Sequence, residues 1–283
     1  MFRLGPLRIR PEAWPPSWLG YTERWLSSAP ALGVKGELTL AIERDPAAAG
    51  APAVAMTLHE LLSATRCAPG IWELLGLGLF VARYDEAKSR MDMRIASDDD
   101  DPGLVLGNAL RGLAATALPA RHDGLMIHAC AGIHDGAGVL VAGISTAGKS
   151  TLALGFERTV YLSDDVALVS AIHEAPTLEP SPFFGAAGRR GPELQAPLRA
   201  IGVLVDKVLD PEAPSSFECV PHARAAAELL RHVARFSSDR ELSDRLLALT
   251  VALTERVPVV LVKRSLRDPS DEVVRSILAV AGC

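Results

Sequence analysis

The stretch GISTAGKST, residues 143–151, is the most informative part of this chain. Its glycines, Gly143 and Gly148, lie on either side of a short loop, and Lys149 and Ser150 follow directly. Glycine leaves no side chain to block a ligand from approaching the backbone, so successive N–H groups of such a loop can converge on phosphate oxygens. The stretch therefore predicts a phosphate-binding loop.

The sequence around the loop is the context that this kind of site requires. The stretch fits the pattern GxxxxGK[ST] without a mismatch, the apolar run VLVAG leads into it as an expected strand, and residues 149–157 are an expected helix. In such loops the lysine contacts the phosphates and the serine hydroxyl is a ligand of Mg2+. We therefore predict that ATP and Mg2+ bind here. The residues expected to bind the nucleotide are Gly143, Ser145, Thr146, Ala147, Gly148, Lys149, Ser150 and Thr151.

A pair of adjacent aspartates, Asp164 and Asp165, follows the loop in the segment YLSDDVALVS. Adjacent aspartates often mark only a turn. In a phosphate-loop enzyme, however, one carboxylate can help to hold Mg2+ and another can accept the proton of an attacking hydroxyl. We place Asp164 with Ser150 as candidate metal ligands and favour Asp165 as the general base, but the sequence alone does not assign the two roles. The same pair would also suit hydrolysis.

Composition and charge limit the classes of protein to which the chain can belong. Of its 283 residues, 49% are hydrophobic and 22% are charged, which is ordinary for a globular protein. The net charge of -5 gives no overall attraction for nucleic acid or anionic lipid. No uninterrupted apolar run has membrane length, and the first residues lack the apolar segment of a secretory signal. We therefore expect a cytoplasmic protein whose partners are neither nucleic acids nor membranes.

Residues 1–97 are expected to form a separate β-rich region, which is a candidate for recognising the acceptor of the phosphate. Its expected strands are 2–9, 37–42 and 91–95. The run DDDDPG that follows has no spacing between its carboxylates, so we interpret it as a solvated boundary and not as a metal site. A helix is expected to begin there and to end near Pro119.

Residues 98–283 alternate segments typical of strands and of helices, which favours an α/β domain. The later elements expected are strands at 201–205 and 257–263 and helices at 223–235, 239–255 and 270–280. Between them, the glycine-rich segment FFGAAGRRGPELQ carries Arg189 and Arg190. These guanidinium groups are candidates to close over the site and to contact phosphate or an acidic peptide terminus.

The stretch IHACAGIHDGAGVLVAGISTAGKSTLALGF, followed by YLSDDVALVS, resembles the HPr kinase/phosphorylase superfamily, including HPr-kinase-like enzymes of peptide biosynthetic clusters such as lasso-peptide tailoring kinases. The family pattern runs from a strand histidine, here His128, through GVLxxGxSGxGKS to an aspartate pair. Two positions depart from it. The family loop usually has glycine at the position of Thr146, and true HPr kinases commonly have glutamate at the position of Thr151. With the segment ERVPVVLVKR, the similarity extends over roughly residues 104–280.

This resemblance implies an α/β P-loop kinase domain of HPr-kinase type that follows the N-terminal β-rich region. It implies ATP- and Mg2+-dependent phosphorylation of a serine hydroxyl on a protein or peptide, and a ribosomally synthesised peptide precursor is one candidate acceptor. His128 would lie near the γ-phosphate and would act with Lys149, Asp164 and Asp165. Family members are often oligomeric, so the resemblance leaves a homo-oligomer open.

Other functions are compatible with the same residues. A kinase of a small metabolite would use the same loop and acids, and a nucleotide-dependent switch would hydrolyse ATP without an acceptor. A degenerate nucleotide-binding scaffold would have lost the reaction. The intact Lys149, Ser150 and aspartate pair disfavour the scaffold, whereas Thr146 and Thr151 keep it open.

Overall fold

The structure is a computed structural model, and it describes residues 2–15, 18, 36–45, 62–76, 78–97, 101–183, 185, 191–207 and 213–282. The chain forms two compact units. Unit 1 comprises Met1–His122 with Arg235–Asp244, and unit 2 comprises Asp123–Ala234 with Arg245–Cys283. Within the described residues, no helix combines the length and the apolar composition needed to cross a membrane.

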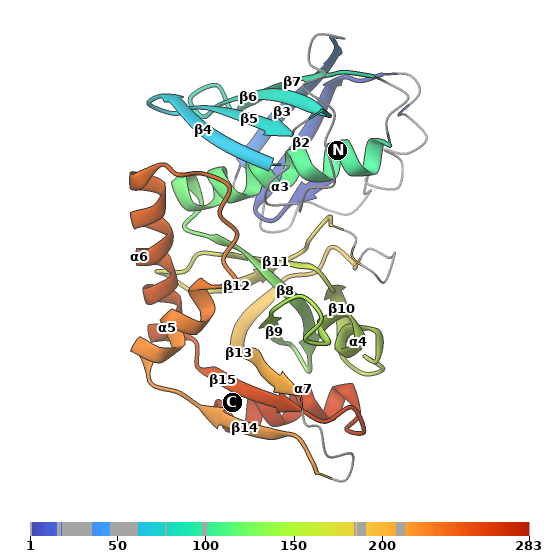
Figure 1. Cartoon of the computed structure of the whole chain (residues 1–283), viewed down its shortest axis with the longest axis vertical. Helices are drawn as coiled ribbons and strands as arrows, with labels where there is room; N and C mark the ends of the chain where they lie inside the picture. The colour runs from blue at the N-terminus through green and yellow to red at the C-terminus, as the bar shows by residue number, and fades with distance from the viewer. Residues whose placement is uncertain are drawn as a thin grey trace. The chain divides into compact units, whose positions relative to one another are not determined.

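Unit 1 is built on a sheet with the strand order β1-β2-β3-β7-β6-β5-β4 (Figure 1). Its strands are β1 (Phe2–Leu4), β2 (Leu7–Ala13), β3 (Gly36–Arg44), β4 (Leu62–Ala68), β5 (Ile71–Gly76), β6 (Phe80–Asp85) and β7 (Arg90–Ile95). Buried and accessible side chains alternate along β5 to β7, so one face of the sheet carries a core that includes Trp72, Tyr84 and Met93. The predicted β-rich N-terminal region is confirmed, although the expected strand 2–9 is divided by a turn at Gly5.

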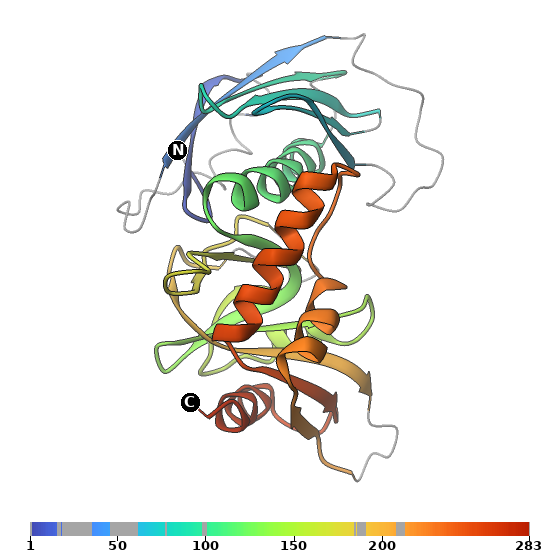
Figure 2. The same ribbon diagram turned by 90° about the vertical axis from the view of Figure 1, so that its left-hand side faces the viewer.

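Helix α3 (Pro102–Arg121) belongs to unit 1 and lies against β4, β5 and β6 (Figure 2). The carboxylate of Asp101 accepts a hydrogen bond from the N–H of Gly103 at 2.8 Å, which caps the start of the helix. Gly112 faces the sheet, where a Cβ would be in van der Waals contact with Leu62 at 3.4 Å. Because α3 covers this sheet, unit 1 extends to His122, whereas the sequence analysis placed the boundary after residue 97.

Unit 2 contains a mixed sheet with the order β10-β8-β11-β12-β13-β15-β14, in which β9 pairs with β8 and β13. Its strands are β8 (Leu125–His134), β9 (Ala137–Gly143), β10 (Val160–Ser163), β11 (Val166–Ser170), β12 (Thr177–Glu179), β13 (Ala196–Lys207), β14 (Ser216–Cys219) and β15 (Val259–Arg264). The helices that follow α3 are α4 (Lys149–Leu154), α5 (His222–Leu230), α6 (Arg240–Arg256), within which the two units divide, and α7 (Ser270–Val280). The expected α/β fold is confirmed, but α4 and α5 end earlier than predicted.

Strands β9, β13 and β15 are parallel, so their carboxyl ends meet at one edge of the sheet. Leu204 of β13 is in register with Gly143 of β9 and with Val262 of β15. In open α/β sheets, ligands bind at the carboxyl ends of parallel strands. The predicted phosphate loop begins at this edge.

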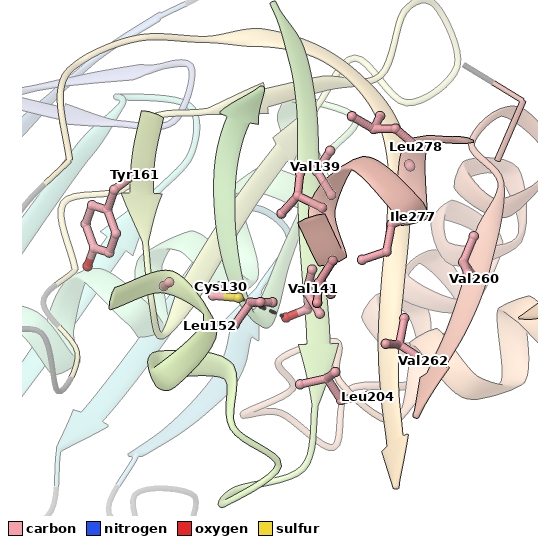
Figure 3. Close-up of a cluster of buried hydrophobic side chains, with 14 residues drawn as sticks. Cys130, Val139, Val141, Leu152, Tyr161, Leu204, Val260, Val262, Ile277 and Leu278 are labelled. Atoms are coloured by element: carbon pink, nitrogen blue, oxygen red, sulfur yellow. Dashed lines mark hydrogen bonds between the residues drawn. The ribbon is translucent and has the colours of Figure 1, made fainter. Parts of the chain in front are cut away.

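One face of these parallel strands is held by a buried apolar cluster beneath α4 and α7 (Figure 3). Val139 and Val141 of β9 contribute to it together with Leu152 of α4 and Ile277 of α7. A Cβ at Gly202 would lie 2.9 Å from Ile277 Cδ1, so the glycine in β13 makes room for α7. This core fixes the strand that ends in the phosphate loop.

The start of α7 is tied to the turn after α4 by the carboxylate of Asp271. It accepts hydrogen bonds from the N–H groups of Glu157, Arg158 and Thr159 at 3.0, 2.9 and 3.0 Å, and from the Thr159 hydroxyl at 2.6 Å. Burial alone would raise the pKa of the Asp271 carboxyl, but these donors outweigh it and lower the pKa to about 2. Asp271 is therefore ionised and stabilises the folded state over the neutral pH range.

We expect Asp271→Asn to lower the free energy of unfolding by about 2–3 kcal/mol at pH 7, because the amide cannot accept all of these hydrogen bonds. The folded-state pKa lies below the unfolded value of about 3.9, so the stabilisation is complete above that pH and is lost as the pH falls towards 2. Urea unfolding followed by circular dichroism at several pH values measures this difference. The control is Glu272→Gln, which removes the charge of an exposed neighbouring carboxylate and should change stability little. Equal effects of the two substitutions at pH 7 would contradict the prediction.

Candidate phosphate-transfer site

The loop between β9 and α4 makes a tight turn. At Gly143 a Cβ would lie 3.1 Å from the Cβ atoms of both Ala147 and Leu204, so a side chain there would crowd the turn. The N–H of Ala147 donates to the carbonyl of Ile144 at 3.1 Å and closes the turn. Gly148 has a φ of 100°, in the left-handed region that favours glycine.

Thr146, the position at which the resembled family usually has glycine, has a φ of 71°. A β-branched residue is rare in this region, and the left-handed conformation costs an L-residue about 1–2 kcal/mol. The loop therefore keeps the glycine-type backbone although the glycine is absent. Strain of this kind is characteristic of functional sites.

Lys149 is held inside the loop that it follows. Its side chain is 6% exposed, and Nζ donates to the carbonyls of Gly143 at 2.8 Å and Ile144 at 2.9 Å. Burial lowers the pKa of the Lys149 ammonium, an effect partly opposed by Cys130 and Asp165. An ammonium with a third N–H and only neutral carbonyl partners is well placed to contact an anion bound at the loop.

The two adjacent aspartates have different surroundings. Asp164 is 1% exposed and accepts a hydrogen bond from the hydroxyl of Tyr161 at 2.7 Å. The side chain of Asp165 is 26% exposed, and its Oδ1 lies 3.4 Å from Nδ1 of His128, whose side chain is 43% exposed. Pairing between β8 and β11 brings them together, since His128 is in register with Val166, the residue after Asp165. The structure thus places Asp165 beside His128 and near enough to Lys149 to affect its pKa, and it buries Asp164.

His232, which the sequence analysis did not identify, lies beside these residues. Its backbone carbonyl accepts a hydrogen bond from the N–H of His128 at 2.8 Å. Burial, followed by the charges of His128, Lys149 and Arg231, lowers the pKa of His232 to about 4, so its imidazole is neutral at pH 7. The residue follows α5, far from the loop in sequence, and no local motif marks it.

A cavity of about 660 Å³ adjoins the loop on the α5 side of the sheet. Ile144 and His232 line this cavity, together with residues at the carboxyl ends of β13 and β15 and in β14. Cavities of this size accommodate small ligands and cofactors. Asp165 is not among its lining residues.

The remaining residues that the sequence analysis predicted to bind a nucleotide and a metal differ in their exposure. Ser145, Thr146 and Thr151 are exposed, whereas Ala147 and Ser150 are half-buried. No group of three or more histidine, cysteine, aspartate or glutamate side chains in the described part of the chain could hold a metal ion by itself. Mg2+ prefers a few protein oxygens together with phosphate oxygens and water, which the Ser150 hydroxyl and the aspartate pair fit. The predicted Arg189 and Arg190 lie outside the described residues.

Comparisons with known proteins find no matching family model and no matching curated protein. Solved structures do match, among them the Hpr(Ser) kinase/phosphatase from Coxiella burnetii. That alignment has 18% sequence identity, covers 56% of this chain and 93% of that chain, and has a TM-score of 0.28. The chemistry of the site is therefore derived from its own residues.

We expect substitutions at the two left-handed loop positions to have opposite effects on stability. Thr146→Gly should raise the free energy of unfolding by about 0.5–1 kcal/mol, because relief of backbone strain exceeds the entropy that glycine adds to the unfolded chain. Gly148→Ala should lower it by about 1–2 kcal/mol, since alanine takes on the strain that glycine avoids. Urea unfolding of both variants tests this, and a stability loss in Thr146→Gly would show that the threonine side chain stabilises the loop.

Proposed function

We propose that this protein is an ATP- and Mg2+-dependent kinase that phosphorylates a serine hydroxyl on a protein or peptide. The observation that carries the proposal is the position of Asp165, next to His128 and close enough to Lys149 to influence its ionisation. A carboxylate beside the lysine of a phosphate loop suits transfer to a hydroxyl, because the attacking group must lose a proton.

The proposed reaction begins with the γ-phosphate of ATP near Lys149 and an acceptor hydroxyl near Asp165. The hydroxyl oxygen forms a bond to the γ-phosphorus as the bond from that phosphorus to the β,γ-bridging oxygen breaks. ADP leaves with the electron pair of the broken bond, and Asp165 takes the hydroxyl proton. Lys149 and the N–H groups of the loop stabilise the charge on the phosphoryl oxygens. Ser150 and Asp164 would hold Mg2+, which would supply positive charge to stabilise the phosphates.

The different surroundings of the two aspartates support Asp165 as the base. A general base must reach the proton that it accepts, and Asp165 is the more accessible of the pair. Asp164 already accepts a hydrogen bond from Tyr161, and a Cβ at Gly185 would lie 2.4 Å from its Oδ1. We propose that Asp164 orients this segment and contributes to the metal site from behind Asp165.

His128 is proposed to position the transferring group. Its ring has one nitrogen directed at Asp165, and its side chain is partly accessible. Its backbone is fixed on one side by β11 and on the other by the carbonyl of His232. With Nδ1 facing the carboxylate of Asp165, Nε2 is the ring nitrogen left to face a phosphoryl oxygen, and the imidazolium form would donate to both.

The test is transfer of label from γ-labelled ATP to serine-containing peptides, an HPr-type carrier protein and free serine, with Lys149→Ala as the control. Label on a peptide or protein serine that depends on Lys149 would support the proposal. Label on free serine alone would indicate a small-metabolite kinase. Release of free phosphate without any labelled acceptor would favour the nucleotide-dependent switch. Turnover and ATP affinity that do not change in Lys149→Ala would contradict the assignment of the loop.

We expect Asp165→Asn to lower kcat for phosphotransfer by about 100-fold or more, because proton acceptance by a positioned base contributes a factor of this order. The affinity for ATP should change little, since the amide retains the size of the carboxylate. Asp135→Asn is the matched control, because Asp135 is exposed in the turn between β8 and β9 and loses the same charge. Single-turnover phosphotransfer and equilibrium ATP binding measure the two effects. Full activity in Asp165→Asn would exclude this carboxylate as the base.

A further inference from the structure

Arg264, the last residue of β15, lies behind the phosphate loop although it is distant from it in sequence. The parallel pairing of β9, β13 and β15 carries the end of β15 to the edge where the loop begins. Its side chain is 4% exposed. Nη1 donates to the carbonyl of Gly148 at 3.1 Å, and Nη2 makes a long contact of 3.4 Å with the hydroxyl of Ser270.

The guanidinium of Arg264 is incompletely satisfied for a buried cation. Its Nε is buried and has no hydrogen-bond partner, and no carboxylate in the described part of the chain forms an ion pair with it. Burial lowers the pKa of Arg264, and Cys130 and Asp268 oppose this only in part. Cys130 is itself buried, which raises the pKa of its thiol to about 12, so at pH 7 it carries no negative charge. Buried arginines are ordinarily paired with anions, because leaving such a charge uncompensated is costly.

The contact with Gly148 acts on the peptide group that joins it to Lys149. In a trans peptide the carbonyl and the following N–H point in opposite directions, and the described chain contains no cis peptide. Arg264 and the N–H of Leu152 both bind the Gly148 carbonyl, the latter at 2.9 Å. They hold the carbonyl away from the loop, so the N–H of Lys149 faces the inside of the loop, where phosphate oxygens are expected.

Lys149 and Arg264 are therefore two buried cations that both contact carbonyls of the loop, Lys149 at its start and Arg264 at Gly148. Each has one acid near enough to raise its pKa, Asp165 for Lys149 and Asp268 for Arg264, but within the described residues neither cation forms an ion pair with its acid. A polyphosphate bound at the loop would supply the missing negative charge to both.

We propose that Arg264 is a positioning residue of the phosphate loop, which directs the N–H of Lys149 at the phosphates and whose buried charge is balanced by bound polyphosphate. The ligand class is a polyphosphate, with or without a nucleoside, because the contact is made to the loop backbone and not to a base or sugar. The inference rests on the phosphate-binding part of the proposed function and is independent of the acceptor.

The experiment measures the affinities of the full chain for ATP and for inorganic triphosphate by calorimetry, together with the melting temperature with and without triphosphate. The variants are Arg264→Met, Arg264→Lys and the control Arg275→Met, which removes an exposed arginine from α7. We expect Arg264→Met to weaken both ligands by the same factor, about 10- to 100-fold, since a hydrogen bond from a charged donor and its charge are lost. Arg264→Lys should recover part of this loss, because it restores the charge without the planar donor. Arg275→Met should bind both ligands as the wild type does.

The melting temperature separates this role from a merely structural one. Without ligand, Arg264→Met should melt at the wild-type temperature or higher, because exchanging an uncompensated buried charge for an apolar side chain is often neutral or stabilising. The rise in melting temperature on adding triphosphate should be smaller than in the wild type. Wild-type affinity for triphosphate in Arg264→Met would overturn the inference. Wild-type affinity for triphosphate in Arg264→Lys would overturn the positioning role. Arg264→Lys provides this test even if Arg264→Met does not fold.

The same measurements distinguish failure of the inference from failure of the proposed function. A wild-type protein that binds neither ATP nor triphosphate would contradict the loop assignment and, with it, the role of Arg264. Triphosphate binding that depends on Arg264 in a protein without phosphotransfer would contradict only the proposed reaction. Triphosphate binding that does not depend on Arg264, in an active kinase, would contradict only the inference.

Discussion

The backbone conformation between Gly143 and Lys149 is the constraint on which the rest of unit 2 depends. A loop that presents N–H groups to phosphate must turn sharply and use left-handed residues, here Thr146 and Gly148. Such a conformation persists only where its surroundings impose it. The apolar cluster beneath β9 and α4 anchors both ends of the loop, and Arg264 holds its last peptide group from behind. The packing of unit 2 thus supports a conformation that is locally unfavourable.

The charged side chains near the loop lie at the carboxyl ends of the parallel strands β9, β13 and β15. Lys149 and Arg264 are both buried and contact different carbonyls of the loop, and the carboxylate that influences Lys149 belongs to the neighbouring segment between β10 and β11. His232 adds no positive charge at pH 7, because its imidazole is neutral there. Arg224, Arg231 and Lys263 line the cavity at this edge, and Asp165 lies on the β8 and β11 side. The edge therefore combines positive side chains at and beside the loop with one acid that acts on Lys149.

The sequence allowed prediction of the parts of the site that are encoded locally. The glycine loop, Lys149 and the aspartate pair each lie within a short segment whose residue types have a direct chemical meaning, and the strand before the loop follows from its apolar pattern. His232 and Arg264 could not be found in this way, because they reach the site only through pairing of distant strands and the path of α5. The extent of unit 1 was missed for a related reason. The contact of α3 with β4 to β6 is tertiary, whereas the acidic run before the helix was interpreted as a boundary from composition alone.

At the start of α7, the buried and incompletely bonded guanidinium of Arg264 lies near Asp271, a carboxylate that accepts four hydrogen bonds. Asp271 accepts hydrogen bonds from the turn after α4. Its neighbour Ser270 contacts Arg264 through its hydroxyl. The same hydroxyl would lie 2.4 Å from a Cβ at Gly155. The start of α7 therefore contacts the segment that follows α4. Through Arg264 it is also linked to Gly148, the residue before α4. The strongly bound carboxylate stabilises this junction independently of any ligand, whereas the uncompensated guanidinium destabilises it until an anion is bound. Because Asp271 stabilises the same part of the fold in which Arg264 is buried, the fold can tolerate the charge of Arg264 even though a bound ligand, and not a residue of the chain, neutralises it.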